Sequence, residues 1–205
     1  MLSLTDMPLS AIKFDGEKYQ INLAFDNVIK YLELVEDDSE NKELEALKLF
    51  FGDQEIPLDP DFIESSFKLI NETITKSAYQ GSFSKDWSMN IAPQHIYSYE
   101  QDADAIYSSF MMQYHIDLLK ERGKMHWCVF RALFDGLSED TPIKRIIELR
   151  QKNLTDVSDE QRGKVMQLQQ YYALNLKKPK TEEDVFNSSS LSSAFASLMN
   201  AAKEG

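Results

Sequence analysis

The stretch IYSSFMMQYHIDLLKERGKMHWCVFRALFDGL, residues 106–137, holds two of the chain's three histidines, its single cysteine and one of its two tryptophans. Such crowding is typical either of an active site or of the core of a helical protein. Apolar residues recur at helical spacing on both sides of a break that ends at Gly123, which predicts two helices, about 102–114 and 124–136. The second is apolar over more than half of its circumference, as central helices are.

Ahead of this stretch, AIKFDGEKYQINL (11–23) predicts a β-hairpin. Asp15 and Gly16 are suited to the two positive-φ positions of a tight turn. That turn places Ile12 opposite Tyr19, and one face then carries Ile12, Phe14, Tyr19 and Ile21. Because a lone hairpin is marginal in water, we expect this face to pack on helices.

Apolar spacing and capping residues predict further helices on both sides. They are expected at about 24–36, at 42–51 before Gly52, from Pro60 behind the cap Asp59, from Pro142 behind the cap Thr141, and more weakly at 158–174. Three stripes are expected to face inward: Ile63, Phe67, Ile70, Ile74 and Ala78; Ala103, Ile106, Tyr107, Phe110, Met111 and Tyr114; and Val165, Leu168 and Tyr172. Residues 80–101 read as a long connection, pinned by Trp87, Ile91 and Ile96.

The predicted fold class is mainly α: a helical bundle with a small N-terminal hairpin and a flexible or docked C-terminal tail. One helical domain is expected over 1–174, and a charged, serine-rich linker with a short amphipathic segment over 175–205. Leu191, Phe195, Leu198 and Ala202 align in that segment. Such a segment can dock on the body, stay a frayed terminus, or bind a partner. In the last case, we expect it to bind a second copy or another protein through Leu191, Phe195, Leu198 and Met199.

Composition excludes some classes of function. The net charge of -12 and pI near 4.7 argue against a general nucleic-acid binder and against an anionic membrane surface, because both need basic residues. One cysteine cannot form an intramolecular disulfide, and no apolar run approaches the roughly 20 residues of a membrane helix. The N-terminus lacks the features of a secretory signal. We expect a soluble, cytosolic protein.

The sequence offers few residues for catalysis. On a helix, His126 and Cys128 would point about 200° apart, so we expect them not to meet. His126 lies in the apolar arc between Phe130 and Leu133, which favours a core histidine with one hydrogen-bond partner over a catalytic base. His95, His115 and His126 lie in different segments, and no metal-ligand or phosphate-loop motif is present. We therefore expect no enzyme, no metal and no cofactor.

One basic group runs against the overall charge: Lys144, Arg145, Arg150 and Lys152, with Arg122 and Lys124 before the central helix. We interpret it as an ordinary solvated face, and a nucleic-acid site as the alternative.

The stretch YEQDADAIYSSFMMQYHIDLLKERGKMHWCVFRALFDGLSEDTPIKRIIELR (99–150) resembles the gene-product-fifteen family of phages and prophages of Gram-positive bacteria. The family pattern is an acidic lead-in, Ile-Tyr-x-x-Phe, Tyr-Gly-Ile-Asp-Leu, Leu-His-Trp-Trp-x-Phe and a terminal Ile-x-x-Arg. Here it appears as Asp102, Asp104, Ile106, Tyr107, Phe110, Tyr114, Ile116, Asp117, Leu118, Met125, His126, Trp127 and Phe130. His115 replaces the glycine, so we expect that helix end to lack the easy positive φ.

The resemblance covers about 1–152 and implies a non-catalytic tail assembly chaperone of long-tailed phages, acting in the cytoplasm of the bacterial host. Its implied partners are the tape measure protein, which it would keep soluble, and the tail-tube protein, which it would recruit. A phage-encoded nucleic-acid-binding or regulatory protein is the alternative. A hydrolase using His126 is a third hypothesis and requires a solvent-open His126.

Overall fold

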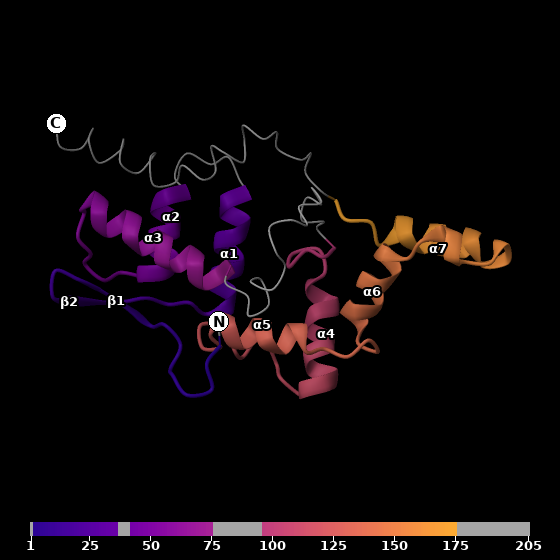
Figure 1. The fold of residues 1–205 in the computed structure, drawn as a ribbon, viewed down its shortest axis with the longest axis horizontal. Helices are drawn as coiled ribbons and strands as arrows, with labels where there is room; N and C mark the ends of the chain where they lie inside the picture. The colour runs from indigo at the N-terminus through magenta and orange to yellow at the C-terminus, as the bar shows by residue number, and fades with distance from the viewer. Residues whose placement is uncertain (1, 37–41, 76–95, 176–205) are drawn as a thin grey trace, which may run out of the picture. The chain divides into compact units, whose positions relative to one another are not determined.

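The computed structural model describes residues 2–36, 42–75 and 96–175 (Figure 1). This part of the chain is mainly helical with one two-stranded hairpin, which confirms the predicted fold class. Its elements are β1 (Ala11–Phe14), β2 (Glu17–Gln20), α1 (Phe25–Glu36), α2 (Lys42–Phe51), α3 (Pro60–Thr75), α4 (Ala103–Tyr114), α5 (Trp127–Asp135), α6 (Pro142–Gln151), the 3-10 turn η1 (Leu154–Asp156) and α7 (Asp159–Tyr171).

The described chain divides into two compact units. Unit 1 comprises 2–36, 42–75 and 122–131, and unit 2 comprises 96–121 and 132–175. The boundary therefore falls within α5. One helical domain over 1–174 stays a prediction.

The hairpin of unit 1 has the predicted register, with Ile12 opposite Tyr19. Asp15 and Gly16 turn the chain at φ 46° and 84°. The expected face packs on α3, because the rings of Phe14 and Tyr19 lie 5.2 and 4.9 Å from that of Phe62. Burying this face supplies the support that a hairpin needs in water.

The core of unit 1 forms where α1, α2 and α3 meet. Val28, Phe50, Phe62 and Ile70 are fully buried there. Residues 122–131 join this unit through the backbone: Trp127 N–H donates to the carbonyl of Leu23 at 2.7 Å, and Phe25 N–H donates to that of Met125 at 2.9 Å. The predicted caps Asp59 and Thr141 precede α3 and α6, but only Asp59 accepts a backbone N–H, from Asp61.

In unit 2, α4 and α6 pack together, and the Ile143 N–H donates to the Ser109 hydroxyl at 3.1 Å. The buried face of α4 and its cap comprises Asp102, Ile106, Ser109 and Phe110. The predicted arc is therefore wrong at Ala103 and Met111, which are exposed, because Ser109 faces α6 instead.

Three other predictions are corrected. The helix expected from 124 begins at Trp127, because the backbone of 125–127 pairs with that of 23–25. His115 does adopt a positive φ of 55° at the end of α4, despite its side chain. No residue of α7 is buried, although Val165 and Leu168 were expected to face inward. Ala78, Trp87 and Ile91 lie outside the described residues.

Candidate functional site

His126 lies directly before α5 in unit 1 and caps it. Its Nδ1 accepts the backbone N–H of Cys128 at 3.1 Å, and its Nε2 lies 3.0 Å from the carbonyl oxygen of Leu9. The first N–H groups of a helix have no partner inside the helix, so a side-chain acceptor there stabilises its start. Nδ1 also lies 3.1 Å from the Cys128 sulfur. The expectation that these two side chains do not meet is wrong, because His126 precedes the helix.

These contacts define the protonation of both groups. An Nδ1 that accepts the Cys128 N–H carries no proton, so Nε2 carries it and donates to Leu9. Burial lowers the pKa of His126, which keeps the ring neutral, and burial raises the pKa of the Cys128 thiol. A nucleophilic cysteine needs a thiolate, which this environment disfavours. The half-buried His126, with both nitrogens occupied, is a structural cap and not the solvent-open base that the hydrolase hypothesis requires.

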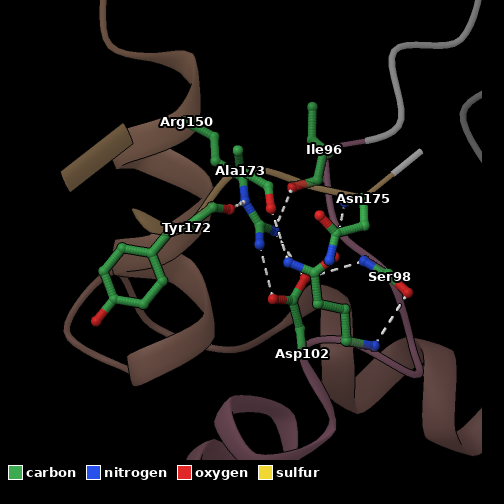
Figure 2. A network of polar contacts seen from close by, with 8 residues as sticks. Ile96, Ser98, Asp102, Arg150, Tyr172, Ala173 and Asn175 are labelled. Atoms are coloured by element: carbon green, nitrogen blue, oxygen red, sulfur yellow. Dashed lines mark hydrogen bonds and ion pairs between the residues drawn. The ribbon is translucent and has the colours of Figure 1, made fainter. Parts of the chain in front are cut away.

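A second polar cluster, the Arg150 network, lies in unit 2 (Figure 2). Arg150 at the end of α6 binds both carboxylate oxygens of Asp102, at 2.7 and 2.8 Å. It also donates to the carbonyl oxygens of Ile96 at 3.0 Å and Tyr172 at 2.7 Å. The two side chains are only 9% and 5% exposed. A two-point contact between guanidinium and carboxylate is geometrically specific, so this pair fixes the start of α4 against the end of α6.

Asp102 has further partners within the network. It accepts the Ser98 N–H at 2.9 Å. Next to it, Gln101 donates to the carbonyl of Ala173 at 2.8 Å and accepts the Asn175 N–H at 2.9 Å. The network therefore holds three segments, 96–102, the end of α6 and 172–175. The charges of the buried pair are compensated within it.

Arg150 is consequently not part of a solvated basic face, and that interpretation is corrected. Other residues of the basic group are engaged in local contacts. Arg145 pairs with Asp140 at 3.3 Å, and Lys144 donates to the Asp135 carbonyl and lies 5.8 Å from the centre of the Phe134 ring. Arg122 lies 3.9 Å from Asp26. These contacts leave little concentrated positive charge for a phosphate backbone.

The residues predicted as a core motif are distributed over both units. Ile106 and Phe110 are buried in unit 2, and Trp127 and Phe130 are buried and stacked in unit 1. Tyr107 and Tyr114 are half-buried, and their hydroxyls donate to Asp117 at 3.3 Å and to the Leu133 carbonyl at 2.9 Å. The predicted partner-binding residues Leu191, Phe195, Leu198 and Met199 lie outside the described residues.

Asp102 and Arg150 were not predicted as a pair. They are 48 positions apart, and an arginine at a helix end normally indicates a solvated charge. The usable signal was the family pattern, whose acidic lead-in and terminal arginine are these two residues.

Two kinds of feature are absent from the described part of the chain. Three or more histidine, cysteine, aspartate or glutamate side chains do not gather there in a metal-binding arrangement. None of its helices is long and apolar enough to cross a membrane.

The fold and sites define a mainly helical protein whose polar clusters cap helices and join segments. A family model described as Bacteriophage Gp15 protein matches residues 4–174. The chain therefore belongs to this family and is a phage protein. No curated protein and no solved structure matches the chain.

Proposed function

We propose that this phage protein is a tail assembly chaperone that binds the tape measure protein, keeps it soluble and helps to recruit tail-tube subunits. Family membership and the resemblance over the central motif support the proposal. The acidic composition supports it too, because a chaperone of an aggregation-prone chain must itself stay soluble, and a charge of -12 promotes this.

The observation that carries the proposal is the number of large apolar side chains exposed on the described residues. They include four of the chain's eight methionines. Methionine is flexible and polarisable, so surfaces rich in it adapt to varied apolar partners. The exposed residues are Leu4, Met7, Leu44, Leu58, Met111, Met112, Leu119, Met166, Leu168 and Tyr171.

Co-expression with the tape measure protein of the same phage tests the proposal. We expect the tape measure protein to be insoluble alone, and to become soluble and co-purify when this chain is present. The double variant Met112→Gln with Leu119→Gln should solubilise less client, because it removes two apolar side chains that are 52% and 67% exposed.

The matched control is Glu139→Gln, an exposed position in the same unit. It should solubilise the client as well as the wild type does. All variants should keep the wild-type melting temperature. If the client stays insoluble whether or not this chain is present, the chaperone proposal is wrong.

A further inference from the structure

Helix α7 is attached to the rest of unit 2 by polar contacts. None of its thirteen residues is buried. The Gln169 side chain donates to the carbonyls of Leu149 and Lys152, at 3.0 and 2.8 Å, and so caps the end of α6. Arg162 donates to the Leu154 carbonyl at 3.3 Å. On the N-terminal side of α7, the nearest buried apolar side chain is that of Val157.

The chain just after α7 is held in the same way. The Tyr172 carbonyl accepts from Arg150 (Figure 2). Gln101 binds the backbone of Ala173 and Asn175. These bonds all use backbone groups that water can satisfy once the segment moves away. Hydrogen bonds that exchange with water stabilise little. A helix of this length is marginal alone, and the apolar side chain Val165 of α7 is only half-buried. The attachment is therefore weak compared with the packing of α4 on α6.

The contact between Arg150 and the segment after α7 can be lost while the other contacts of the Arg150 network stay in place. Of the four hydrogen bonds of Arg150, only the one from Nε reaches residues 159–175. The two bonds to Asp102 and the bond to Ile96 lie wholly outside that segment. Losing the Tyr172 contact leaves the buried ion pair compensated, so the energetic penalty of an unpaired buried charge does not arise.

We propose that residues 159–175 form an arm that detaches from unit 2 while α4, α6 and the Asp102–Arg150 pair stay folded. Val157 is the fixed point from which the arm moves. Detachment exposes the carbonyls of Leu149 and Lys152 at the end of α6. The arm is thus a conformational device of this fold, and it does not depend on the proposed function.

Hydrogen exchange of the full chain, followed by mass spectrometry, tests the proposal. Peptides from 159–171 should exchange at least tenfold faster than peptides from α4 and α6, because local opening of the arm precedes global unfolding. Complete exchange of the arm at the earliest time, with α4 and α6 protected, also supports it. Equal protection of all three helices would show that α7 belongs to the core and would overturn the proposal.

Two variants probe the attachment directly. Gln169→Ala and Gln101→Ala should each speed exchange in 159–171 by about tenfold, without changing exchange in α4 or α6. The matched control is Gln167→Ala, an exposed glutamine in the same helix, which should not speed it. Both variants replace glutamine by alanine in the same helix, so the change in helix propensity is the same. A difference in exchange rate between the Gln169→Ala and Gln167→Ala proteins therefore reports the loss of the two hydrogen bonds of Gln169. Faster exchange of α4 and α6 in Gln169→Ala would contradict a separate arm.

Discussion

At the scale of single residues, His126 works as a neutral group. Only the neutral ring offers Nδ1 as an acceptor to the Cys128 N–H while Nε2 donates to Leu9. Protonation would remove that acceptor and place a charge in a half-buried site. The lowered pKa and the capping geometry are therefore two results of the same environment.

We predict that His126→Ala lowers the free energy of unfolding by roughly 1–3 kcal/mol at pH 7, since a cap and a partly buried hydrogen bond are lost. His126→Asn should lose less, because its side-chain oxygen can still accept the Cys128 N–H. Urea unfolding of the three proteins measures this. A His126→Ala protein with wild-type stability would show that the cap contributes nothing.

The same variants show how the contribution of His126 to the free energy of unfolding depends on pH. Because the folded-state pKa of His126 is lowered from its ordinary value of 6.5, the unfolded chain binds more protons below about pH 6.5. The contribution of His126 is therefore present above that pH and is lost as pH falls below it. The stability difference between wild type and His126→Asn should shrink over this range. A difference that stays constant between pH 7.5 and 5.5 would contradict the neutral cap.

Arg150 and Asp102 illustrate the other kind of polar residue, a buried charge with a partner. We predict that Arg150→Met destabilises the protein by about 3–5 kcal/mol, because the Asp102 carboxylate is left buried without its counter-charge. Arg145→Met, in the same helix, removes an exposed pair with Asp140 and should cost less than about 1 kcal/mol. Thermal and urea unfolding compare the two. Equal effects would mean that the Arg150 network is not structural.

At the scale of elements, local signals predicted most of the fold. The Asp-Gly turn predicted the register of β1 and β2, and Asp59-Pro60 and Thr141-Pro142 predicted where α3 and α6 begin. These signals act within a few residues, so sequence alone contains them.

The errors have long-range causes. The start of α5 depends on backbone pairing with residues 23–25, about a hundred positions away in sequence, and the apolar periodicity of 124–136 carries no trace of it. The Asp102–Arg150 pair is hidden for the same reason. For α7, the periodicity is present, but Val165 is only half-buried and Leu168 is exposed. Periodicity shows that a helix can form a face, and only tertiary contacts decide whether that face is buried.

Two positions with positive φ test the turns. Gly16→Ala should destabilise the hairpin by roughly 1–2 kcal/mol, because φ 84° is strained for a residue with a Cβ. His115→Gly should stabilise the protein by up to about 1 kcal/mol, since glycine adopts φ 55° without that strain. The melting temperature should therefore fall for Gly16→Ala and rise for His115→Gly, and thermal unfolding of both variants measures this. A lower melting temperature for His115→Gly would mean that its side chain contributes more than the strain costs.

At the scale of the whole molecule, charge is distributed unevenly. Residues 1–83 hold 17 acidic and 7 basic side chains, so most of the net charge of -12 comes from this part of the sequence. Arg150, the one basic residue of α6 that is nearly buried, is already neutralised by Asp102. The molecule should therefore repel polyanions.

We predict that the protein binds neither duplex nor single-stranded nucleic acid tightly at physiological salt. Gel-shift measurements should show no complex at submicromolar protein, because a chain with a net charge of -12 repels phosphates. A DNA-binding protein of known affinity serves as the positive control. Submicromolar binding that weakens steeply with salt would favour the regulatory alternative over the chaperone.

The sequence after residue 175 lies outside the described residues and carries an apolar pattern. Leu191, Phe195, Leu198 and Ala202 recur there at helical spacing, behind a linker with Pro179 and three consecutive serines. A helix of this length is marginal alone, so its apolar stripe needs a surface to bind. If that surface belongs to a second copy or to the client, removing the segment should not affect the stability of the remaining chain.

Deleting 187–205 should therefore leave the melting temperature nearly unchanged and weaken self-association or client solubilisation. Light scattering after size exclusion and the co-expression assay measure these effects on both proteins. The double variant Leu191→Ser with Phe195→Ser should reproduce the deletion at full length, since it removes the apolar stripe and keeps the linker. A truncated chain that melts many degrees lower would place the segment in the core, because only packing against the body could then explain the loss.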